Sequence, residues 1–339
     1  MPGVAQSGNS RISAIVTGNV EKGARLADFH GVDRVLNYSE YDAFLAGDAA
    51  DAVYIALPNS LHADYAIRAA RAGKHVMVEK PLAATVADAE AMIAAAKEGG
   101  VFLMTAYRLH NEPGTLAVLE YIRGGAIGQP RFFHSIFSCQ VNPDNHRLKA
   151  EHWGGPLQDI GVYCLNTARH IFAEEPIEVS AMINQPADDE RFGEVEASIA
   201  VTLRFSSGGL AQFIASFGAG EMDGYRVVGE YGDLELSPGY RFETATKLRL
   251  RRGGEAREIA FPQIDHFGAQ TAYFSDCIMA GMPPEADGEE GLADVRALLA
   301  IEKAARTGRP QPIASAPRSR HPTADMVRMT SVTARRLVL

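Results

Sequence analysis

Two short segments contain residues whose types and spacing could move a proton. Glu79-Lys80-Pro81 directly follows an apolar run at 74–78 that predicts a buried strand. A lysine at the carboxyl end of a parallel strand lies where open α/β sheets bind ligands, and the proline after it restricts the backbone so that the amine is aimed. Asp159 and Tyr163 are four residues apart, so on one helical turn they share a face. If these side chains meet in a cleft, they could move a proton on and off a sugar hydroxyl.

Each of these three side chains has a candidate role and an ordinary alternative. Tyr163 is the candidate general acid/base, because a nearby cation such as Lys80 could let a phenol work near neutrality. Tyr163 could instead be a helix tyrosine whose hydroxyl lies at the surface, and Lys80 a strand-end lysine that faces water. Asp159 could orient the substrate hydroxyl or the Lys80 amine, and it could also cap the helix N-terminus.

The first third of the chain alternates strands and helices. Strands are predicted at 11–16, 52–57, 74–78 and 101–104, and helices at 21–30, 61–72 and 86–98. Gly73 suits the end of the second helix. Alternation of this length is typical of a parallel, doubly wound sheet. We therefore predict an α/β fold with a Rossmann-type dinucleotide-binding domain over residues 1–109.

The pattern changes beyond about residue 125. Strands are predicted at 131–138, 178–184, 197–205, 210–217, 225–228, 234–236 and 248–252, and helices at 161–172, 267–279 and 291–305. Ser-Ser-Gly-Gly at 206–209 is a hairpin-type connection. We predict a C-terminal α+β domain over 110–314 with an open, mainly antiparallel sheet for substrate binding and oligomerisation. The apolar alternation at 197–205, continued by Leu210 and Ile214, needs cover, so we expect a homodimer or homotetramer through this sheet.

The composition excludes several classes of protein. The 339 residues suffice for two domains, and 46% hydrophobic with 22% charged residues is ordinary for a soluble protein. A net charge of −9 argues against nonspecific binding to nucleic acid, and no apolar run is long enough for a transmembrane helix. Residues 315–339 form a basic C-terminal extension with a net charge of +4, and we expect it to be solvated or loosely packed.

The cysteines, the histidines and the first residues bear on metal sites and location. Cys139, Cys164 and Cys277 lack metal or disulfide spacing, which indicates free thiols in a reducing compartment. None of the ten histidines lies in an H-E-x-x-H pattern, so we predict no catalytic metal. The first residues lack the regions of a signal peptide, which predicts a cytoplasmic protein. A periplasmic location stays open if a signal segment lies upstream.

A glycine-rich turn is missing where a dinucleotide-binding sheet needs one. Such a sheet begins with a strand, a G-x-G-x-x-G turn and a helix whose N-terminus holds the pyrophosphate. The ten residues before the first predicted strand, at 11–16, contain no such pattern. We expect that the chain begins inside the first helix, so that the dinucleotide-binding domain is N-terminally incomplete. A shortened, cofactor-free protein is the other possibility.

The chain resembles the glucose–fructose oxidoreductase branch of the Gfo/Idh/MocA superfamily. The matching segments, which together span about residues 2–312, are 16–22, 52–62, 73–82, 107–108, 157–166, 174–179, 288–291 and 304–310. The resemblance implies an NADP-dependent reaction in which a hydride passes between the nicotinamide and a carbinol carbon of a sugar or polyol, while a side chain handles the hydroxyl proton. It also implies that Tyr163 is the acid/base, and that Lys80-Pro81 is a cis peptide.

Further residues are candidates for binding the cofactor and the sugar. Thr17, Asn19 and Lys22 follow the first predicted strand, where an NAD enzyme usually has an acidic residue, so we favour NADP over NAD. Leu57, Pro58, Asn59, His62, Glu79, Lys80 and Arg108 complete the candidate cofactor contacts, although His62 fits a structural role better and Arg108 an ion pair equally well. Arg147, Trp153 and Asn166 are the candidate substrate contacts, because Trp153 offers a flat face to a pyranose. Trp153 could instead be a packed aromatic in an ordinary loop, and Asn166 a helix-surface amide.

Two functions from different classes remain open on these residues. The first is an NADP-dependent sugar oxidoreductase, either an aldose dehydrogenase that yields a lactone or a reductase of a sugar ketone. The second is a non-catalytic sugar-binding or scaffold relative that has lost its cofactor half-site, which the missing glycine turn favours. The presence of Lys80, Asp159 and Tyr163 together favours the enzyme.

Overall fold

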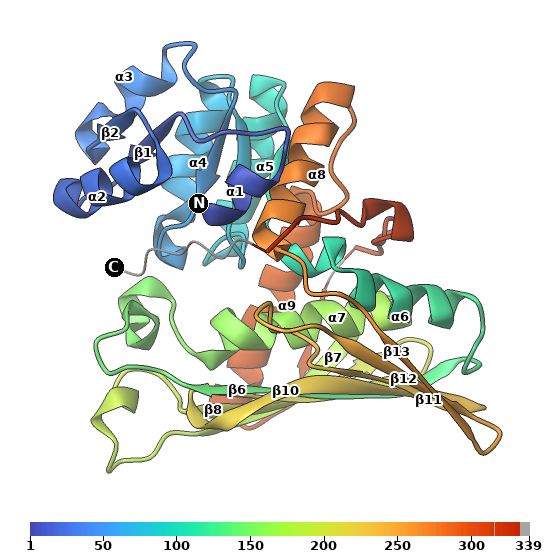
Figure 1. Ribbon diagram of the computed structural model, residues 1–339. Coiled ribbons are helices and arrows are strands. Elements are labelled where there is room, and N and C mark those ends of the chain that lie inside the picture. Colours follow the sequence, from blue (N-terminus) through green and yellow to red (C-terminus); the bar gives the residue numbers. More distant parts are fainter. Residues whose placement is uncertain (315, 333–339) are drawn as a thin grey trace.

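The chain folds into a parallel α/β domain and a large sheet covered by helices. The computed structural model describes residues 1–314 and 316–332. In Figure 1 the first domain lies above the sheet, and helices α6, α7 and α9 lie between them on the upper face of the sheet. The fold class predicted from the sequence is confirmed. No helix among the described residues is long and apolar enough to span a membrane.

The first domain contains two parallel sheets. Strand β1 (Ala14–Val16) pairs with β2 (Arg34–Leu36), and β4 (His75–Val78) lies between β3 (Ala52–Ile55) and β5 (Leu103–Thr105). The helices of this part of the chain are α1 (Pro2–Gln6), α2 (Val20–His30), α3 (Tyr41–Leu45), α4 (His62–Arg71) and α5 (Val86–Gly99), with short 3-10 turns at Tyr38–Glu40, Asn59–Leu61 and Arg108–Asn111. Strand β2 and helix α3 are among the elements that the sequence patterns did not predict.

Local chemistry explains where these helices begin and end. Asn19 caps α2 by accepting a hydrogen bond from the Lys22 amide, and Thr85 caps α5 in the same way through the Asp88 amide. Gly73 follows the C-cap of α4 with a φ of 74°, a conformation that glycine adopts without strain. The two N-caps therefore mark where the loops after β1 and β4 end and the helices α2 and α5 begin.

The second domain is built on a nine-stranded sheet. Its strand order is β13-β12-β11-β10-β6-β9-β8-β7-β14, and all neighbours are antiparallel except β6 and β9, which are parallel. The strands are β6 (Pro130–Gln140), β7 (Pro176–Asn184), β8 (Ser198–Phe205), β9 (Leu210–Ser216), β10 (Gly218–Gly229), β11 (Gly232–Ser237), β12 (Lys247–Arg252), β13 (Glu255–Ala260) and β14 (Gln311–Pro312). The helices are α6 (Pro113–Arg123), α7 (Val162–Phe172), α8 (His266–Ala280) and α9 (Gly288–Thr307).

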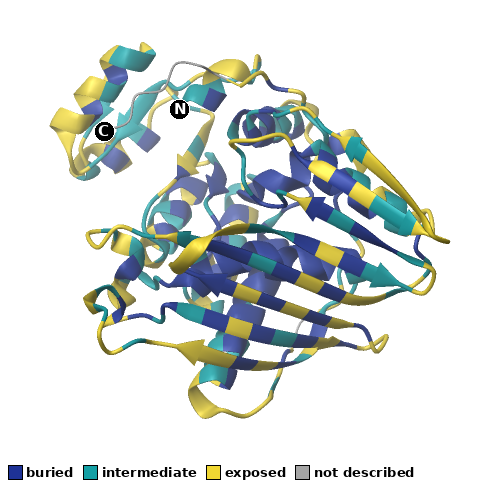
Figure 2. Ribbon diagram, turned by 60° about the horizontal axis from the view of Figure 1, so that its bottom comes forward, coloured by how far each residue is buried: buried dark blue, intermediate teal, exposed yellow. Residues whose placement is uncertain are grey.

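The outer face of this sheet is formed by other apolar residues than the alternation at 197–205 predicts. The alternating residues of β8, such as Ile199 and Leu203, are buried against the helices and do not form the outer face. Leu210 pairs with Arg204 across the hairpin, so Leu210 and Ile214 point to the opposite face, where both are exposed. Figure 2 shows the buried and exposed residues alternating in bands along the strands of the sheet.

The prediction of a solvated basic extension is wrong for its described part. Arg318 lies 2.6 Å from the buried Glu290 carboxylate (Nε to Oε2) and pairs with Asp287 at 3.0 Å. Farther along, Arg328 pairs with Asp276 of α8 at 2.9 Å. Acidic residues at the start of α9 thus hold Arg318, and Asp276 of α8 holds Arg328, so both ends of the described extension are tied to the fold. Residue 315 and residues 333–339 lie outside the described part of the chain.

Candidate active site

Lys80, Asp159 and Tyr163 meet, as the sequence predicts. Lys80 follows β4, its peptide bond to Pro81 is cis, and its Nζ lies 3.0 Å from Asp159 Oδ1 and 2.6 Å from the Asp159 carbonyl oxygen. Asp159 lies in a π-helical turn at Leu157–Gly161 that runs directly into α7, and so it is not an N-cap. The Lys80 ammonium also lies 4.9 Å from the centre of the Tyr163 ring.

A second cation completes the charge balance around Asp159. Arg147 Nε lies 3.0 Å from Asp159 Oδ2, so each carboxylate oxygen faces one cation. Burial alone would raise the pKa of Asp159, but Lys80 and Arg147 outweigh it and hold the pKa at about 2. Burial alone would lower the pKa of Lys80, but Asp159 outweighs it and the pKa lies above its usual value. The pair therefore stays charged through the neutral range.

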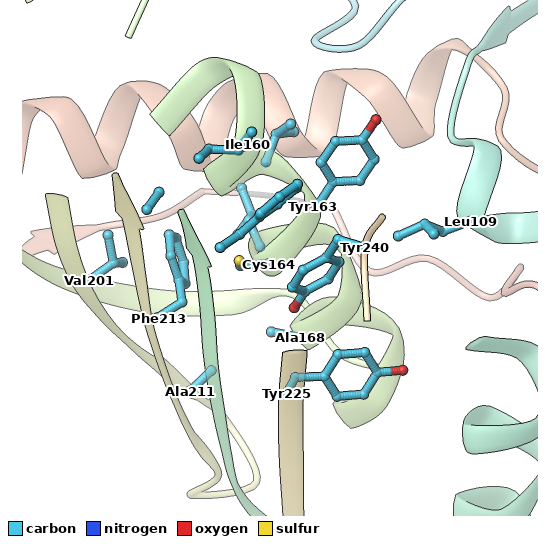
Figure 3. Packing of buried hydrophobic residues seen from close by; sticks show 14 of the residues in the cluster. Leu109, Ile160, Tyr163, Cys164, Ala168, Val201, Ala211, Phe213, Tyr225 and Tyr240 are labelled. Atoms are coloured by element: carbon cyan, nitrogen blue, oxygen red, sulfur yellow. The ribbon is translucent and has the colours of Figure 1, made fainter. Parts of the chain in front are cut away.

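The Tyr163 hydroxyl is held by an arginine from the first domain. Arg108 Nε donates to the Tyr163 hydroxyl at 3.0 Å, and its guanidinium carbon lies 4.7 Å from the centre of the ring. Tyr163 projects from α7, and Figure 3 shows its hydroxyl pointing in the opposite direction from that of the neighbouring Tyr240. The Tyr240 hydroxyl is bonded to Ser135 at 2.6 Å. The Tyr163 hydroxyl therefore faces Arg108, whereas the Tyr240 hydroxyl faces Ser135.

Arg108 is a candidate cofactor contact, and the alternative prediction, an ion pair, finds no carboxylate partner for it among the described residues. Besides Tyr163, it donates to the carbonyl of Tyr240 at 2.6 Å and contacts His266 Nδ1 at 2.9 Å. Helix α8 therefore supports the cluster, and sequence reasoning missed this. A signal was available: His266 and Gln270 are four residues apart on one helix face, and Gln270 donates to the Tyr54 hydroxyl at 3.2 Å.

The candidate cofactor residues lie at the carboxyl ends of β1, β3 and β4. Lys22 is exposed in the first turn of α2, next to the Asn19 cap, and Thr17 Oγ1 accepts from the Asn19 amide at 3.2 Å. Glu79 accepts a hydrogen bond from the Tyr54 hydroxyl. The carboxyl ends of parallel strands, with helix N-termini beside them, are where dinucleotides bind. A surface lysine at that place fits a phosphate group.

Asn59 and His62 follow β3 and have different surroundings. Asn59 Nδ2 donates to the Trp153 carbonyl oxygen at 2.9 Å, which joins the first domain to the loop before α7. His62 is fully buried, and its ring nitrogens lie 2.9 Å from the carbonyl oxygens of Leu57 and Pro81. The structural role predicted for His62 therefore holds, and its burial contradicts a direct contact with the cofactor. The ring ties the backbone at Pro81 to that at Leu57.

The predicted substrate residues divide into two groups. Arg147 lies beside the cluster, where it pairs with Asp159. Trp153 is in the loop before α7, and its indole donates to Glu302 of α9 at 2.8 Å. Asn166 lies farther along α7, and the structure contradicts its predicted contact with substrate. Its side chain is buried, and its amide nitrogen donates to Glu290 at 2.8 Å within a network beneath α9. One turn beyond Tyr163, α7 has turned this side chain toward α9.

That buried network contains one set of residues with metal-ligand atoms. His110, His170 and Glu290 offer ligand atoms within 4.8 Å of one another among the described residues. The carboxylate of Glu290 already accepts hydrogen bonds from Arg169 at 2.7 Å and from Asn166 at 2.8 Å. The positive guanidinium beside this oxygen opposes a second cation, so the set is better explained as part of the buried ion-pair network.

Two family models match this chain. The model described as "Oxidoreductase family, NAD-binding Rossmann fold" matches residues 2–107, and the model "GFO/IDH/MocA C-terminal domain" matches residues 115–235. The first match covers β1 to β5 with Lys80, and the second covers Arg147, Asp159 and Tyr163. The residues that form the cluster thus come from both matched parts.

Proteins named as sugar oxidoreductases are similar to this chain along most of their length. A D-xylose 1-dehydrogenase [NADP(+)] from Haloarcula marismortui is 34% identical over 91% of this chain and 87% of the relative. A 1,5-anhydro-D-fructose reductase from Ensifer adhaerens is 32% identical over 90% of this chain and 92% of the relative. The crystal structure of an aldose–aldose oxidoreductase from Caulobacter crescentus with glycerol has a TM-score of 0.87 and 37% identity, covering 92% of this chain and 95% of the other. A 3-ketoreductase from Actinomadura kijaniata, in complex with NADP and TDP-benzene, has a TM-score of 0.81 and 28% identity, covering 90% and 92% of the two chains.

Proposed function

The chain belongs to the Gfo/Idh/MocA family of oxidoreductases, and from this premise we propose that it is an NADP-dependent oxidoreductase of sugars. The reaction is the oxidation of an aldose to a lactone or the reverse reduction of a sugar ketone. The observation that carries this proposal is the cluster of Lys80, Asp159 and Tyr163, which joins an acid/base hydroxyl to a buried ion pair. The relatives named as sugar dehydrogenases and reductases support the same substrate class.

The side chains of the cluster divide the proton chemistry. When bound, the nicotinamide supplies or accepts the hydride. Tyr163 takes the proton from the reacting sugar hydroxyl in oxidation and returns it in reduction. For this transfer the sugar hydroxyl must lie within hydrogen-bond distance of the Tyr163 oxygen. Lys80 donates a hydrogen bond to the same hydroxyl and stabilises negative charge that develops there. Asp159 fixes the Lys80 ammonium, which donates one hydrogen bond to the Asp159 carboxylate and another to the Asp159 backbone carbonyl oxygen.

The first domain has features that fit NADP. Lys22, at the N-terminal end of α2, would pair with the 2′-phosphate, and Thr17 and Asn19 would present their hydroxyl and amide beside it. Leu57, Pro58, Asn59 and Glu79 would line the nicotinamide end, near Lys80. On the side of the second domain, Trp153 and Arg147 would line the sugar site.

Replacing Lys22 with glutamate is expected to weaken NADP binding about 10- to 100-fold. A lost charge-assisted hydrogen bond to the phosphate costs about 1.5–3 kcal/mol, and the new carboxylate repels the phosphate as well. Binding of NAD, which lacks that phosphate, should change little. Calorimetric titration of both dinucleotides measures the two effects separately. Lys97→Glu, at the far end of α5 and exposed, is the matched control and should leave both affinities unchanged.

An aldose panel tests the proposed reaction directly. The chain is incubated with NADP and one sugar at a time, and reduced nicotinamide is followed by its near-ultraviolet absorbance, with lactone identified by mass spectrometry. We expect turnover with at least one pentose or hexose, and reduction of a sugar ketone when NADPH replaces NADP. Binding of NADP without turnover of any sugar in either direction would overturn the proposal.

The outer face of the nine-stranded sheet supports a homodimer or homotetramer. Exposed apolar side chains gather there from β7 to β9, among them Met182, Leu210 and Ile214. A shallow hollow on the same face is lined by residues of β6 to β9 and by 308–310. A contiguous apolar area on an open sheet is typical of a surface that a second copy covers.

Light scattering at micromolar concentration should give the mass of a dimer or tetramer. Ile214→Arg should shift the mass toward that of the monomer, since the charge must be desolvated at the interface. Met279→Arg, which changes an exposed methionine near the end of α8, is the matched control and should not shift it. A monomeric wild-type chain would contradict the assignment.

A further inference from the structure

Arg108 is a buried cation without a carboxylate partner. Its side chain is 4% exposed, and no aspartate or glutamate of residues 1–314 and 316–332 lies within ion-pair distance of it. The other cations of the cluster, Lys80 and Arg147, share Asp159. A guanidinium withdrawn from water loses its hydration, so an uncompensated one is costly unless a negative charge forms beside it.

The group placed to carry that negative charge is the hydroxyl of Tyr163. Arg108 Nε donates to it at 3.0 Å, and the guanidinium is enclosed by the rings of Tyr163, Phe242 and Phe267 at 4.7, 5.3 and 5.9 Å. Aromatic faces keep a cation dry while they partly stabilise it. In this enclosure the attraction between a guanidinium and a phenolate oxygen is stronger than it would be in water.

His266 fixes the direction of the guanidinium. Burial and the neighbouring Arg108 charge hold the pKa of His266 well below its usual range, so the ring is neutral and its Nδ1 accepts from Arg108 Nη1 at 2.9 Å. The Tyr240 carbonyl accepts from Nη2 at 2.6 Å. With one N–H of each terminal nitrogen held in this way, the plane of the guanidinium is fixed and its Nε–H points at Tyr163.

We propose that Arg108 is the residue that stabilises the deprotonated form of Tyr163, and that His266 of α8 is the positioning residue that aims it. This inference rests on the proposed function, because it assigns a cause to the activity of Tyr163 as a base. In oxidation the substrate O–H bond breaks and the Tyr163 O–H bond forms, while Arg108 keeps its protons throughout. Lys80 then chiefly stabilises charge on the substrate hydroxyl, and Arg108 stabilises charge on the Tyr163 oxygen.

The other charged and titratable groups around Tyr163 act on it in opposite directions. They are Glu79 and Lys80 after β4, Tyr54 on β3, Arg147 in the loop before α7, Asp159 in the turn before α7, Tyr240 after β11, and His266 on α8. Lys80 and Arg147 favour a charged Tyr163 oxygen, and Asp159 and Glu79 oppose it. Since the charges of Lys80 and Arg147 are offset by those of Asp159 and Glu79, Arg108 decides the balance.

The test compares the ionisation of Tyr163 in matched variants without depending on turnover. The chain carries tyrosine labelled with carbon-13 at Cζ, the Tyr163 resonance is assigned with Tyr163→Phe, and its shift is followed against pH. In Arg108→Gln the midpoint should move upward by about one to three pH units, because an opposite charge at hydrogen-bond distance has this effect. Arg108→Lys keeps the positive charge but loses the planar set of guanidinium donors, and it should move the midpoint less than Arg108→Gln does. His266→Leu should also move it upward.

The same variants give a second readout in the aldose assay. The rise of kcat/KM with pH should shift with the NMR midpoint in Arg108→Gln and His266→Leu, while KM changes little. Arg296→Gln, which changes a partly exposed arginine paired with Glu90, should leave both readouts unchanged. If Arg108→Gln loses its far-ultraviolet circular dichroism, Arg108→Lys and His266→Leu carry the comparison.

Each outcome bears on a different statement. An unchanged Tyr163 midpoint in folded Arg108→Gln would overturn the inference even if the chain turns over sugars. A shifted midpoint in a chain that turns over no sugar would leave the inference standing and overturn the proposed function. A shift in Arg108→Gln without one in His266→Leu would remove His266 as the positioning residue.

Discussion

Replacing Lys80 with methionine is expected to lower kcat/KM for sugar oxidation by about 10²- to 10⁴-fold. The change removes the cation that lies 3.0 Å from Asp159 and 4.9 Å from the Tyr163 ring, and with it the hydrogen bond to the reacting hydroxyl. Losing one positioned proton-transfer or charge-stabilising group has an effect of this size. Steady-state kinetics over a range of sugar concentrations separates the loss in kcat from any change in KM.

A lysine at the other end of the same strand provides the control for this variant. Lys74 precedes β4 and donates to the carbonyl of Gly47 at 2.7 Å, far along the strand from Lys80. Lys74→Met should keep kcat/KM within about threefold, since a surface contact is worth little. If Lys80→Met also stayed within that range while binding NADP normally, the assignment of Lys80 to the reaction would fail.

Arg169→Met is expected to lower the free energy of unfolding by about 3–5 kcal/mol. Arg169 is 2% exposed and pairs at 2.7 Å with Glu175, Glu290 and Asp294, of which the last two are fully buried. Removing the guanidinium leaves carboxylates in the interior without their cation, and breaking a buried pair from one side costs about this much. Urea denaturation followed by circular dichroism measures the loss.

The matched comparison for Arg169 is an exposed ion pair on the same layer of helices. Arg296 of α9 pairs with Glu90 at 3.0 Å, and both side chains are partly exposed. Arg296→Met should cost no more than about 1 kcal/mol, as exposed pairs generally do. Equal effects of the two substitutions would show that burial does not set the strength of the Arg169 network.

Much of the fold was predictable because the elements are long and regular. The strand before Lys80 and the helices α4, α5, α7, α8 and α9 follow from apolar periodicity and from glycines such as Gly73. Strand β2 is three residues long and only partly buried, so it lacks a periodic signal. The docking of Arg318 onto Glu290 joins segments far apart in sequence, and composition alone indicated only a basic tail.

The candidate site was predictable where a local pattern places residues together. Lys80 is at a strand end before proline, and Asp159 and Tyr163 are on one helical turn, so the local sequence is enough to single out each segment as a candidate. The partners of Arg108 could not be predicted, because Tyr163 and His266 reach it from 55 and 158 residues away. Asn166 shares the helix with Tyr163, but its burial toward Glu290 depends on how α7 packs on α9.

Binding of NADP to the purified chain tests the central claim most directly. Calorimetric titration with NADP, and with NAD for comparison, reports on the first domain whether or not the right sugar is known. The account predicts micromolar binding of NADP, weaker binding of NAD, and a loss of that preference in Lys22→Glu. No binding of either dinucleotide to the folded chain would contradict the claim that this chain is an NADP-dependent oxidoreductase.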